Sequence, residues 1–149
     1  MNRFALGFFL WAMTHHLVYA QECLHTDQVF RCVEYVDNYD GDTVTFNIPD
    51  LHPFFAYHIA IRIRGVDTPE LRSKNPCEKR LAKRAKLFVS RQLEQAYDIE
   101  LRAIERGKYF RVVADIYADG INLGELLVEE QLAIPYDGGS KKEVDWCSM

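Results

Sequence analysis

Carboxylates and arginines occur together in three short stretches of the sequence. The stretches are "DGDT" at 40–43, "IRIRGVDTPELR" at 61–72 and "KYFR" at 108–111. Carboxylates offered from separate turns suit a hard cation such as Ca²⁺, which collects several oxygen ligands without demanding rigid geometry. Arginine side chains bind phosphate oxygens in a bidentate way and oppose negative charge that develops on them. Together, these residue types indicate cleavage of a phosphodiester.

Each stretch taken alone also has a structural interpretation. Asp and Gly are common turn residues, and exposed ion pairs contribute little stability. An EF-hand is excluded at the first turn, because Gly41 stands at the wrong position and no glutamate closes a twelve-residue loop beginning at 37 or 38. A solvated cluster of surface charges therefore stays open as the alternative.

The elements before the second stretch are predicted to be strands. Strand-like runs at 29–36 and 43–48 flank the turn-forming "DNYDGD", which predicts a hairpin. The stretch "PDLHPFF" contains two prolines and predicts a long loop.

A third strand is predicted at 57–66 and carries the charges of the second stretch. Its isoleucines alternate toward one face and leave Arg62 and Arg64 on the other. Gly65 then permits a bend or bulge. Arg64 and Arg72 are interpreted as solvated charges.

The remainder of the chain mixes one long helix with a second hairpin. A helical apolar period predicts an amphipathic helix at 76–96 with its bases outward. Strands at 98–105 and 109–118 flank the turn "RGK". Asn122 is predicted to cap a short helix, and the tail from residue 135 is predicted to be irregular.

This order of elements predicts an α+β, mainly β fold. Three strands, a helix, two strands and a helix match a five-stranded Greek-key barrel of the OB type with two or so helices. The rim loops of such barrels commonly bind nucleic acid. The length of 149 residues suits one domain.

The N-terminus reads as an export signal. A short positive start and the apolar run "FALGFFLWAM" predict a signal peptide at 1–20, with Gln21 as the mature start and 21–149 as the domain. The apolar run is too short to span a membrane, although a retained anchor is the alternative. We therefore expect a periplasmic or secreted monomer without stable membrane association.

Four cysteines follow that segment, namely Cys23, Cys32, Cys77 and Cys147. An even count behind a signal peptide favours disulfides, whereas zinc is disfavoured because the chain has no C-x₂-C pair. Three connectivities are possible, and locality alone favours Cys23–Cys32 with Cys77–Cys147.

The net charge of −4 argues against a polyanionic partner, but its distribution does not. Residues 72–91 hold eight bases and the single acid Glu78. Such a run is commonly a solvated helix face, yet it could also bring a phosphate chain toward "DTPE".

The motifs, taken in order, resemble those of the staphylococcal nuclease family of Ca²⁺-dependent secreted nucleases. The motifs are "DGDTV", "IRIRGVDTPE", "AKRAKLFV", "KYFRVVADIYADG" and "NLGELLVEEQLA", and the resemblance covers residues 29–136. It implies an OB barrel that hydrolyses DNA and RNA with little sequence preference and leaves 3′-phosphate ends. A non-catalytic nucleic-acid-binding barrel and a structural envelope protein are the alternatives.

The resemblance also implies roles for individual residues. Asp42, Asp67 and the Thr68 carbonyl correspond to Ca²⁺ ligands, with Asp40 as an outer acid. Arg62 and Arg111 correspond to the pair that holds the scissile phosphate, and Glu70 to the residue that activates water. The positions that contact a neighbouring phosphate correspond to Lys108 and Tyr109, while Tyr136 is a weaker candidate for base stacking.

The chain departs from the family pattern at two places. Phe110 stands where the family commonly has glycine, which raises the question of a turn with positive φ and of the placement of Arg111. The chain also ends soon after Tyr136, so we expect the final helix of longer members to be absent or replaced by the cysteine-bearing tail.

Overall fold

The computed structural model describes residues 23–140 and 143–148. The predicted signal peptide at 1–20 and the predicted mature start Gln21 lie outside the described residues. Within the described part, no helix has the length and apolar character needed to cross a membrane.

Strands dominate the regular structure, as the sequence predicts. The strands are β1 (Val29–Phe30), β2 (Glu34–Asn38), β3 (Thr43–Asn47), β4 (Ile59–Ile63), β5 (Val66–Asp67), β6 (Ile99–Arg106), β7 (Val112–Ala118), β8 (Ile121–Asn122) and β9 (Ile134–Pro135). The helices are α1 (Pro53–Ala56), α2 (Pro76–Gln95) and α3 (Leu123–Glu129), with a 3₁₀ turn η1 (Lys108–Phe110).

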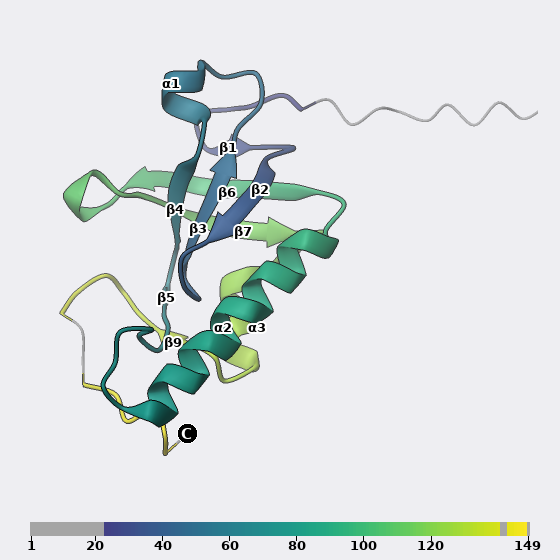
Figure 1. Ribbon diagram of the computed structural model, residues 1–149. Coiled ribbons are helices and arrows are strands. Elements are labelled where there is room, and N and C mark those ends of the chain that lie inside the picture. The colour runs from purple at the N-terminus through teal and green to yellow at the C-terminus, as the bar shows by residue number, and fades with distance from the viewer. Residues whose placement is uncertain (1–22, 141–142, 149) are drawn as a thin grey trace, which may run out of the picture.

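The predicted first strand at 29–36 is wrong as a single element, because a break divides it into β1 and β2. Cys32 has a φ of 50°, which turns the chain between β1 and β2. The sheet order is β1-β6-β7-β4-β3-β2, so β1 and β2 lie at its two ends although only residues 31–33 separate them. The sheet therefore curls around a core, which is the predicted OB-type α+β arrangement (Figure 1).

Alternating apolar residues fill the interior of this curled sheet. Val44 and Phe46 of β3 are fully buried against Ile61 and Ile63 of β4, while Arg62 between them faces the other side. Burying each such side chain contributes about 1.5–3 kcal/mol, so the alternation fixes the register of β4. The predicted outward placement of Arg62 and Arg64 follows from that register.

The predicted loop at "PDLHPFF" contains the short helix α1, which is a correction. Pro53 occupies the first helical turn, where its missing N–H is not needed, and His52 Nδ1 accepts a hydrogen bond from the Phe54 N–H at 3.2 Å. The two prolines were therefore compatible with a helix start. In Figure 1, α1 lies at the end of the molecule opposite the start of α2.

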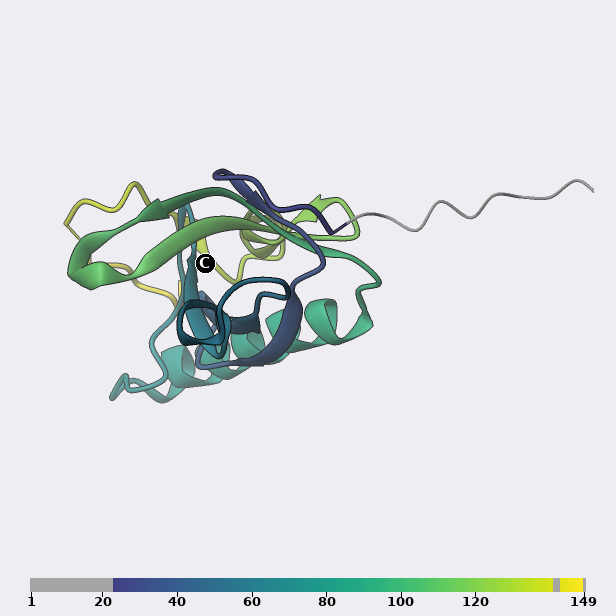
Figure 2. The same cartoon turned by 90° about the horizontal axis from the view of Figure 1, so that it is seen from above.

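The long helix α2 confirms the predicted amphipathic segment. Asn75 caps it by accepting from the Cys77 N–H at 2.9 Å, and Pro76 follows as the first helical residue. Its buried face consists of Ala82, Ala85, Val89 and Leu93. Figure 2 shows α2 on one side of the molecule and the β6–β7 hairpin of the sheet on the opposite side.

The second hairpin begins its return strand later than predicted. The chain forms η1 at Lys108–Phe110 before β7 starts at Val112, because Phe110 has a φ of 58°. The Gly107 N–H donates to the Arg111 carbonyl at 2.7 Å and closes the turn.

The disulfide pairing and the second helix cap are confirmed. Cys23 pairs with Cys32, and Cys77 at the start of α2 pairs with Cys147 in the tail. Asn122 accepts hydrogen bonds from the N–H groups of Gly124 and Glu125, as expected of an N-cap.

Candidate active site

Arg62 connects the first two predicted acidic turns. Its guanidinium donates hydrogen bonds to Asp42 Oδ1 and, at 3.1 Å, to Asp67 Oδ1. A further bond at 3.2 Å to the Val66 carbonyl orients the same group. The ends of β3, β4 and β5 therefore meet at one point, and this places the two predicted metal-ligand carboxylates side by side.

The "DGDT" turn is held against α2 by close packing. A side chain at Gly41 would lie 2.7 Å from the Ala85 Cβ and 2.9 Å from the Thr68 Cγ2, so only glycine fits there. Asn38 Nδ2 donates to the Asp40 carbonyl at 2.7 Å and to the Lys86 carbonyl at 3.0 Å. Contact with the helix therefore fixes the position of the turn and, with it, the position of Asp42 in the site.

Asp42 is a buried carboxylate with an excess of negative charge around it. Burial is the largest cause that raises its pKa to about 6, while Arg62 lowers it and the nearby Asp40 and Asp67 raise it. The Thr68 N–H and hydroxyl both donate to Asp42 Oδ2, at 3.2 and 3.0 Å. Arg62 thus pairs with two acids, and Asp40 adds negative charge near Asp42, which is an environment that favours an additional cation.

Six of the predicted site residues line one open cleft of about 820 Å³ beside Arg62. They are Asp40, Arg62, Glu70, Lys108, Arg111 and Tyr136. Glu70 is exposed and its N–H donates to Glu78 Oε1 at 3.1 Å, which links it to the first turn of α2. The cleft therefore brings together residues that are as far apart in the sequence as positions 40 and 136.

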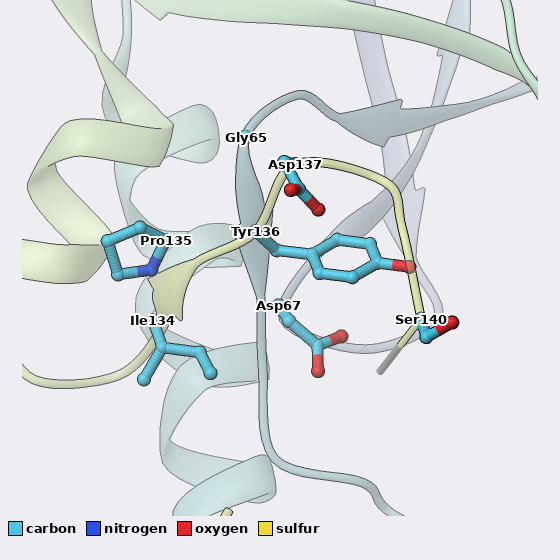
Figure 3. A pocket seen from close by; sticks show the side chains of 7 residues that line it. All are labelled: Gly65, Asp67, Ile134, Pro135, Tyr136, Asp137 and Ser140. Carbon is cyan, nitrogen blue, oxygen red and sulfur yellow. The ribbon is translucent and has the colours of Figure 1, made fainter. Parts of the chain in front are cut away.

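A smaller pocket of about 360 Å³ adjoins this cleft and contains Asp67. Figure 3 shows the Asp67 carboxylate near the Tyr136 ring in this pocket. The pairing of β5 with β9 and a 2.8 Å bond from the Tyr136 N–H to the Gly65 carbonyl hold Tyr136 there. Asp42 and Thr68 are buried and line neither opening.

The β6–β7 turn supplies the remaining predicted residues. Arg111 is exposed and lies in the cleft wall, and Lys108 Nζ donates to the Gly138 carbonyl at 3.1 Å. That bond joins the turn to the chain after Tyr136. The side chain of Tyr109 lies outside the described part of the structure.

The predicted solvated charge at Arg64 is wrong. Arg64 binds Glu105 at 2.6 Å, Asp115 at 3.3 Å and the Ala103 carbonyl, so it joins β4 to β6 and β7. Burial raises the pKa of Asp115, and Arg64 opposes that rise. Arg64 also lines the cleft, and it therefore belongs to the wall behind the site.

Tyr39 is a cleft residue that sequence reasoning missed. It is 52% exposed at the rim, and the Arg72 guanidinium lies 5.9 Å from its ring centre. An aromatic residue inside the polar turn "DNYDGD" was the available signal. Arg72, predicted to be only solvated, is engaged by this ring.

The donor set fits a hard divalent cation only when backbone and water oxygens are included. Within the described residues, no group of three or more His, Cys, Asp or Glu is arranged to hold a metal ion. Asp42 and Asp67 nevertheless share one guanidinium in an acidic surrounding, and Ca²⁺ accepts carboxylate, carbonyl and water oxygens together. We conclude that the pair fits Ca²⁺ as a partial ligand set.

Comparison with known proteins agrees with the resemblance carried by the motifs. The family model described as "Staphylococcal nuclease homologue" matches residues 60–145, which is more than half of the chain. A search of curated proteins found no match.

Proposed function

Because the chain belongs to the family of staphylococcal nuclease homologues, we propose that it is an exported Ca²⁺-dependent nuclease. Its substrates are DNA and RNA, which it hydrolyses with little sequence specificity, leaving 3′-phosphate ends. The observation that carries the proposal is the placement of Arg62, Glu70 and Arg111 on one cleft next to the Asp42–Asp67 pair.

The two arginines bind and orient the phosphate in this proposal. Arg62 is held by the Val66 carbonyl, and Arg111 immediately precedes β7, which pairs with β4, so both guanidinium groups line the same cleft and approach one phosphate together. Both oppose the charge that accumulates on the phosphate oxygens in the transition state. Arg62 must turn part of its guanidinium from Asp42 toward the phosphate.

Asp42, Asp67 and the Thr68 carbonyl would hold Ca²⁺, with Asp40 in the outer shell. The bound ion supplies electrostatic stabilisation of the phosphate charge. The hydrogen bonds from Thr68 to Asp42 Oδ2 fix the carboxylate orientation, and the tight packing of Gly41 keeps the turn in place.

Glu70 acts as the general base. A water molecule held near its carboxylate attacks phosphorus, and its proton passes to Glu70. The bond from phosphorus to the 5′ oxygen breaks, and that oxygen keeps the electron pair and takes a proton from solvent water to become a hydroxyl group. The phosphate stays on the 3′ oxygen of the upstream nucleotide. General-base assistance of this kind contributes about 10² to 10⁴ in rate. Lys108 and Tyr109 bind a neighbouring phosphate, and Tyr136 stacks on a base.

Cleavage of DNA and RNA with added Ca²⁺ or with a chelator tests the proposal. We expect cleavage only with Ca²⁺, and Glu70→Gln should reduce kcat by about 10² to 10⁴ while the circular dichroism spectrum stays unchanged. Glu34→Gln, at an exposed site on β2, is the matched control and should keep full activity. Normal turnover of Glu70→Gln would remove Glu70 from the mechanism.

The second candidate function is a nucleic-acid-binding barrel without catalysis. The family match is compatible with this second candidate, because the match shows membership of the family and does not show that this chain catalyses the reaction. The buried acids disfavour it, since a pure phosphate binder gains nothing from carboxylates that repel phosphate. Tight binding without cleavage in both conditions would favour this candidate over the nuclease.

Export is part of the proposal and draws support from the cysteines. Both disulfides of the described residues are typical of proteins that fold in an oxidising compartment. We therefore place the protein in the periplasm or outside the cell, as a monomer cleaved after residue 20.

A further inference from the structure

Helix α2 presents a strongly basic surface on an otherwise acidic protein. The chain has a net charge of −4, yet six bases of α2 are exposed and none has a described ion pair within residues 23–140 and 143–148. They are Lys79, Arg80, Lys83, Arg84, Lys86 and Arg91. The proposed catalytic roles use none of them.

Glu78, the acid next to the first of these bases in the sequence of α2, does not pair with them. Glu78 accepts hydrogen bonds from the Ser73 hydroxyl at 2.5 Å and from the Glu70 N–H at 3.1 Å. Its carboxylate is therefore directed at the loop between the site and α2. The positive surface stays uncompensated beside that loop.

Three of the bases form a single stripe that we call the lysine stripe, Lys79, Lys83 and Lys86. Their spacing of four and three residues places them on one face of the helix, over a rise of about 10 Å. The buried residues Ala82, Ala85 and Val89 anchor the adjacent face of the helix against the core. The stripe is thus a rigid row of charges.

Helix α2, which carries the lysine stripe, contacts the turn at the rim of the cleft. The Lys86 carbonyl accepts from Asn38 Nδ2 at 3.0 Å, so the helix contacts the turn whose Tyr39 and Asp40 line the cleft. Arg72, which lies over the Tyr39 ring, comes from the loop that precedes α2. An exposed aromatic ring and an arginine therefore stand on the turn that α2 contacts and on the loop that leads into α2.

We propose that the lysine stripe, with Tyr39 and Arg72 at the cleft rim, is a second binding surface for nucleic acid. It takes the phosphates of a single strand that extends beyond the cleft, and Tyr39 offers a ring on which a base can stack. This rests on the proposed function, because the same strand occupies the cleft. The surface would favour long polymers over short oligonucleotides.

An anionic lipid surface is the competing ligand for any row of lysines. Continuity with the cleft and the aromatic residue at the rim favour nucleic acid, because a flat bilayer gains nothing from a stacking ring set between two phosphate sites. The two ligands are separated by experiment below.

The test measures binding of a single-stranded DNA of about 30 nucleotides by the purified protein, with a chelator present and over a salt series of about 50 to 200 mM. Replacing Lys79, Lys83 and Lys86 with glutamine should lower the slope of log K against log salt by about 2 and weaken binding about 10- to 100-fold. Replacing the same lysines with arginine keeps the charge and should keep the slope. An unchanged slope in the glutamine variant overturns the proposal.

Two controls separate local contacts from general effects. Leu24→Glu, Gln28→Glu and Phe54→Glu together alter the net charge equally at exposed positions around β1 and α1, and should keep the wild-type slope. If vesicles of phosphatidylglycerol bind through the lysines while the DNA slope does not change, the surface belongs to lipid and the proposal is wrong.

A failure of the proposed nuclease activity can be distinguished from a failure of the proposed binding surface. With Ca²⁺ present, the glutamine variant should lose kcat/KM for the long strand about tenfold and keep it for an oligonucleotide of about four nucleotides, which cannot span the cleft and the stripe. Absent cleavage together with a lysine-dependent slope would reject the nuclease and retain the binding surface.

Discussion

Phe110 adopts a backbone conformation that the family pattern assigns to glycine. Its φ of 58° lies in the left-handed region, and its side chain is 81% exposed. The Arg106 guanidinium lies 5.4 Å from its ring centre, which is a weak compensation at an exposed site. The turn therefore keeps its shape and stores backbone strain next to Arg111.

We expect Phe110→Gly to stabilise the protein. A non-glycine residue in this conformation costs about 1–2 kcal/mol, and the greater chain entropy of glycine cancels part of that, so the free energy of unfolding should rise by about 0.5–1 kcal/mol. Urea denaturation of the wild type and of Phe110→Gly measures this difference in the free energy of unfolding.

Phe110→Ala is the control, since it removes the ring and keeps the strain. It should leave stability within about 0.5 kcal/mol of the wild type. Equal gains from alanine and glycine would show that the ring, and not the backbone, is the source of the strain.

At the level of residues, local patterns predicted the orientation of side chains and missed distant partners. The alternation in β4 correctly set Arg62 apart from the buried isoleucines. Arg64 on the same face was interpreted as solvated because its partners, Glu105 and Asp115, are more than forty positions away along the chain. Only the pairing of β4 with β7 and of β7 with β6 brings them near, and a single sequence does not reveal strand register.

At the level of elements, Arg64 is the side chain that ties β4 to the β6–β7 hairpin. Arg64→Met should cost about 1–3 kcal/mol at neutral pH, because it leaves Asp115 and Glu105 without their cation. Arg91→Met on the exposed face of α2 should cost less than about 0.5 kcal/mol.

The cost of Arg64→Met should depend on pH with a defined sign. Burial raises the pKa of Asp115, so the folded state binds more protons than the unfolded state, and stability falls as pH rises through the folded pKa. Removing Arg64 raises that pKa further. The difference in unfolding free energy between wild type and variant should therefore grow from about pH 4 to pH 7, and a constant difference would contradict the pairing.

Element boundaries were predictable where a cap was visible and were wrong where the backbone turned unexpectedly. Asn122 marked the start of α3 because its side chain accepts from the following N–H groups, whereas the start of α2 was predicted at Pro76 from the change of apolar period, without its cap Asn75. The break after β1 depends on the positive φ of Cys32, which is paired with Cys23 in a disulfide. The residue types at 29–36 do not predict this break. The late start of β7 has the same cause at Phe110.

At the scale of the whole molecule, one disulfide closes a long loop. Cys77 and Cys147 are 70 positions apart, whereas Cys23 and Cys32 are 9 apart. In the chain-entropy model, opening the longer loop costs about 4 kcal/mol and opening the shorter one about 3 kcal/mol. The longer bridge fixes the tail to the start of α2, close to the Glu78 carboxylate that binds the Glu70 N–H.

We therefore expect the Cys77→Ser/Cys147→Ser double variant to lose more stability than Cys23→Ser/Cys32→Ser. Thermal unfolding of both variants without reductant measures the difference, and the wild type with a reductant should lose more than either. An equal or smaller loss for the longer bridge would show that native-state strain outweighs loop entropy.

The net charge of the molecule was a poor guide to its ligands, because acids and bases are segregated. Bases gather on α2, while Asp40, Asp42 and Asp67 gather around a single arginine. If this acidic point holds Ca²⁺, binding must be linked to global stability, since the unfolded chain does not bring positions 42 and 67 together. Unfolding free energy should rise by about 2.7 kcal/mol at a Ca²⁺ concentration 100 times Kd.

Thermal unfolding with Ca²⁺ and with a chelator measures this linkage without any substrate. Asp67→Asn should flatten the dependence on Ca²⁺, while Asp27→Asn, at an exposed position before β1, should keep it. Each variant is compared with itself, so a change in its baseline stability does not matter. A full stabilisation by Ca²⁺ in Asp67→Asn would show that the ion binds elsewhere than at Asp42 and Asp67. No stabilisation of the wild type by Ca²⁺ would leave Arg62 as the cation that these acids bind.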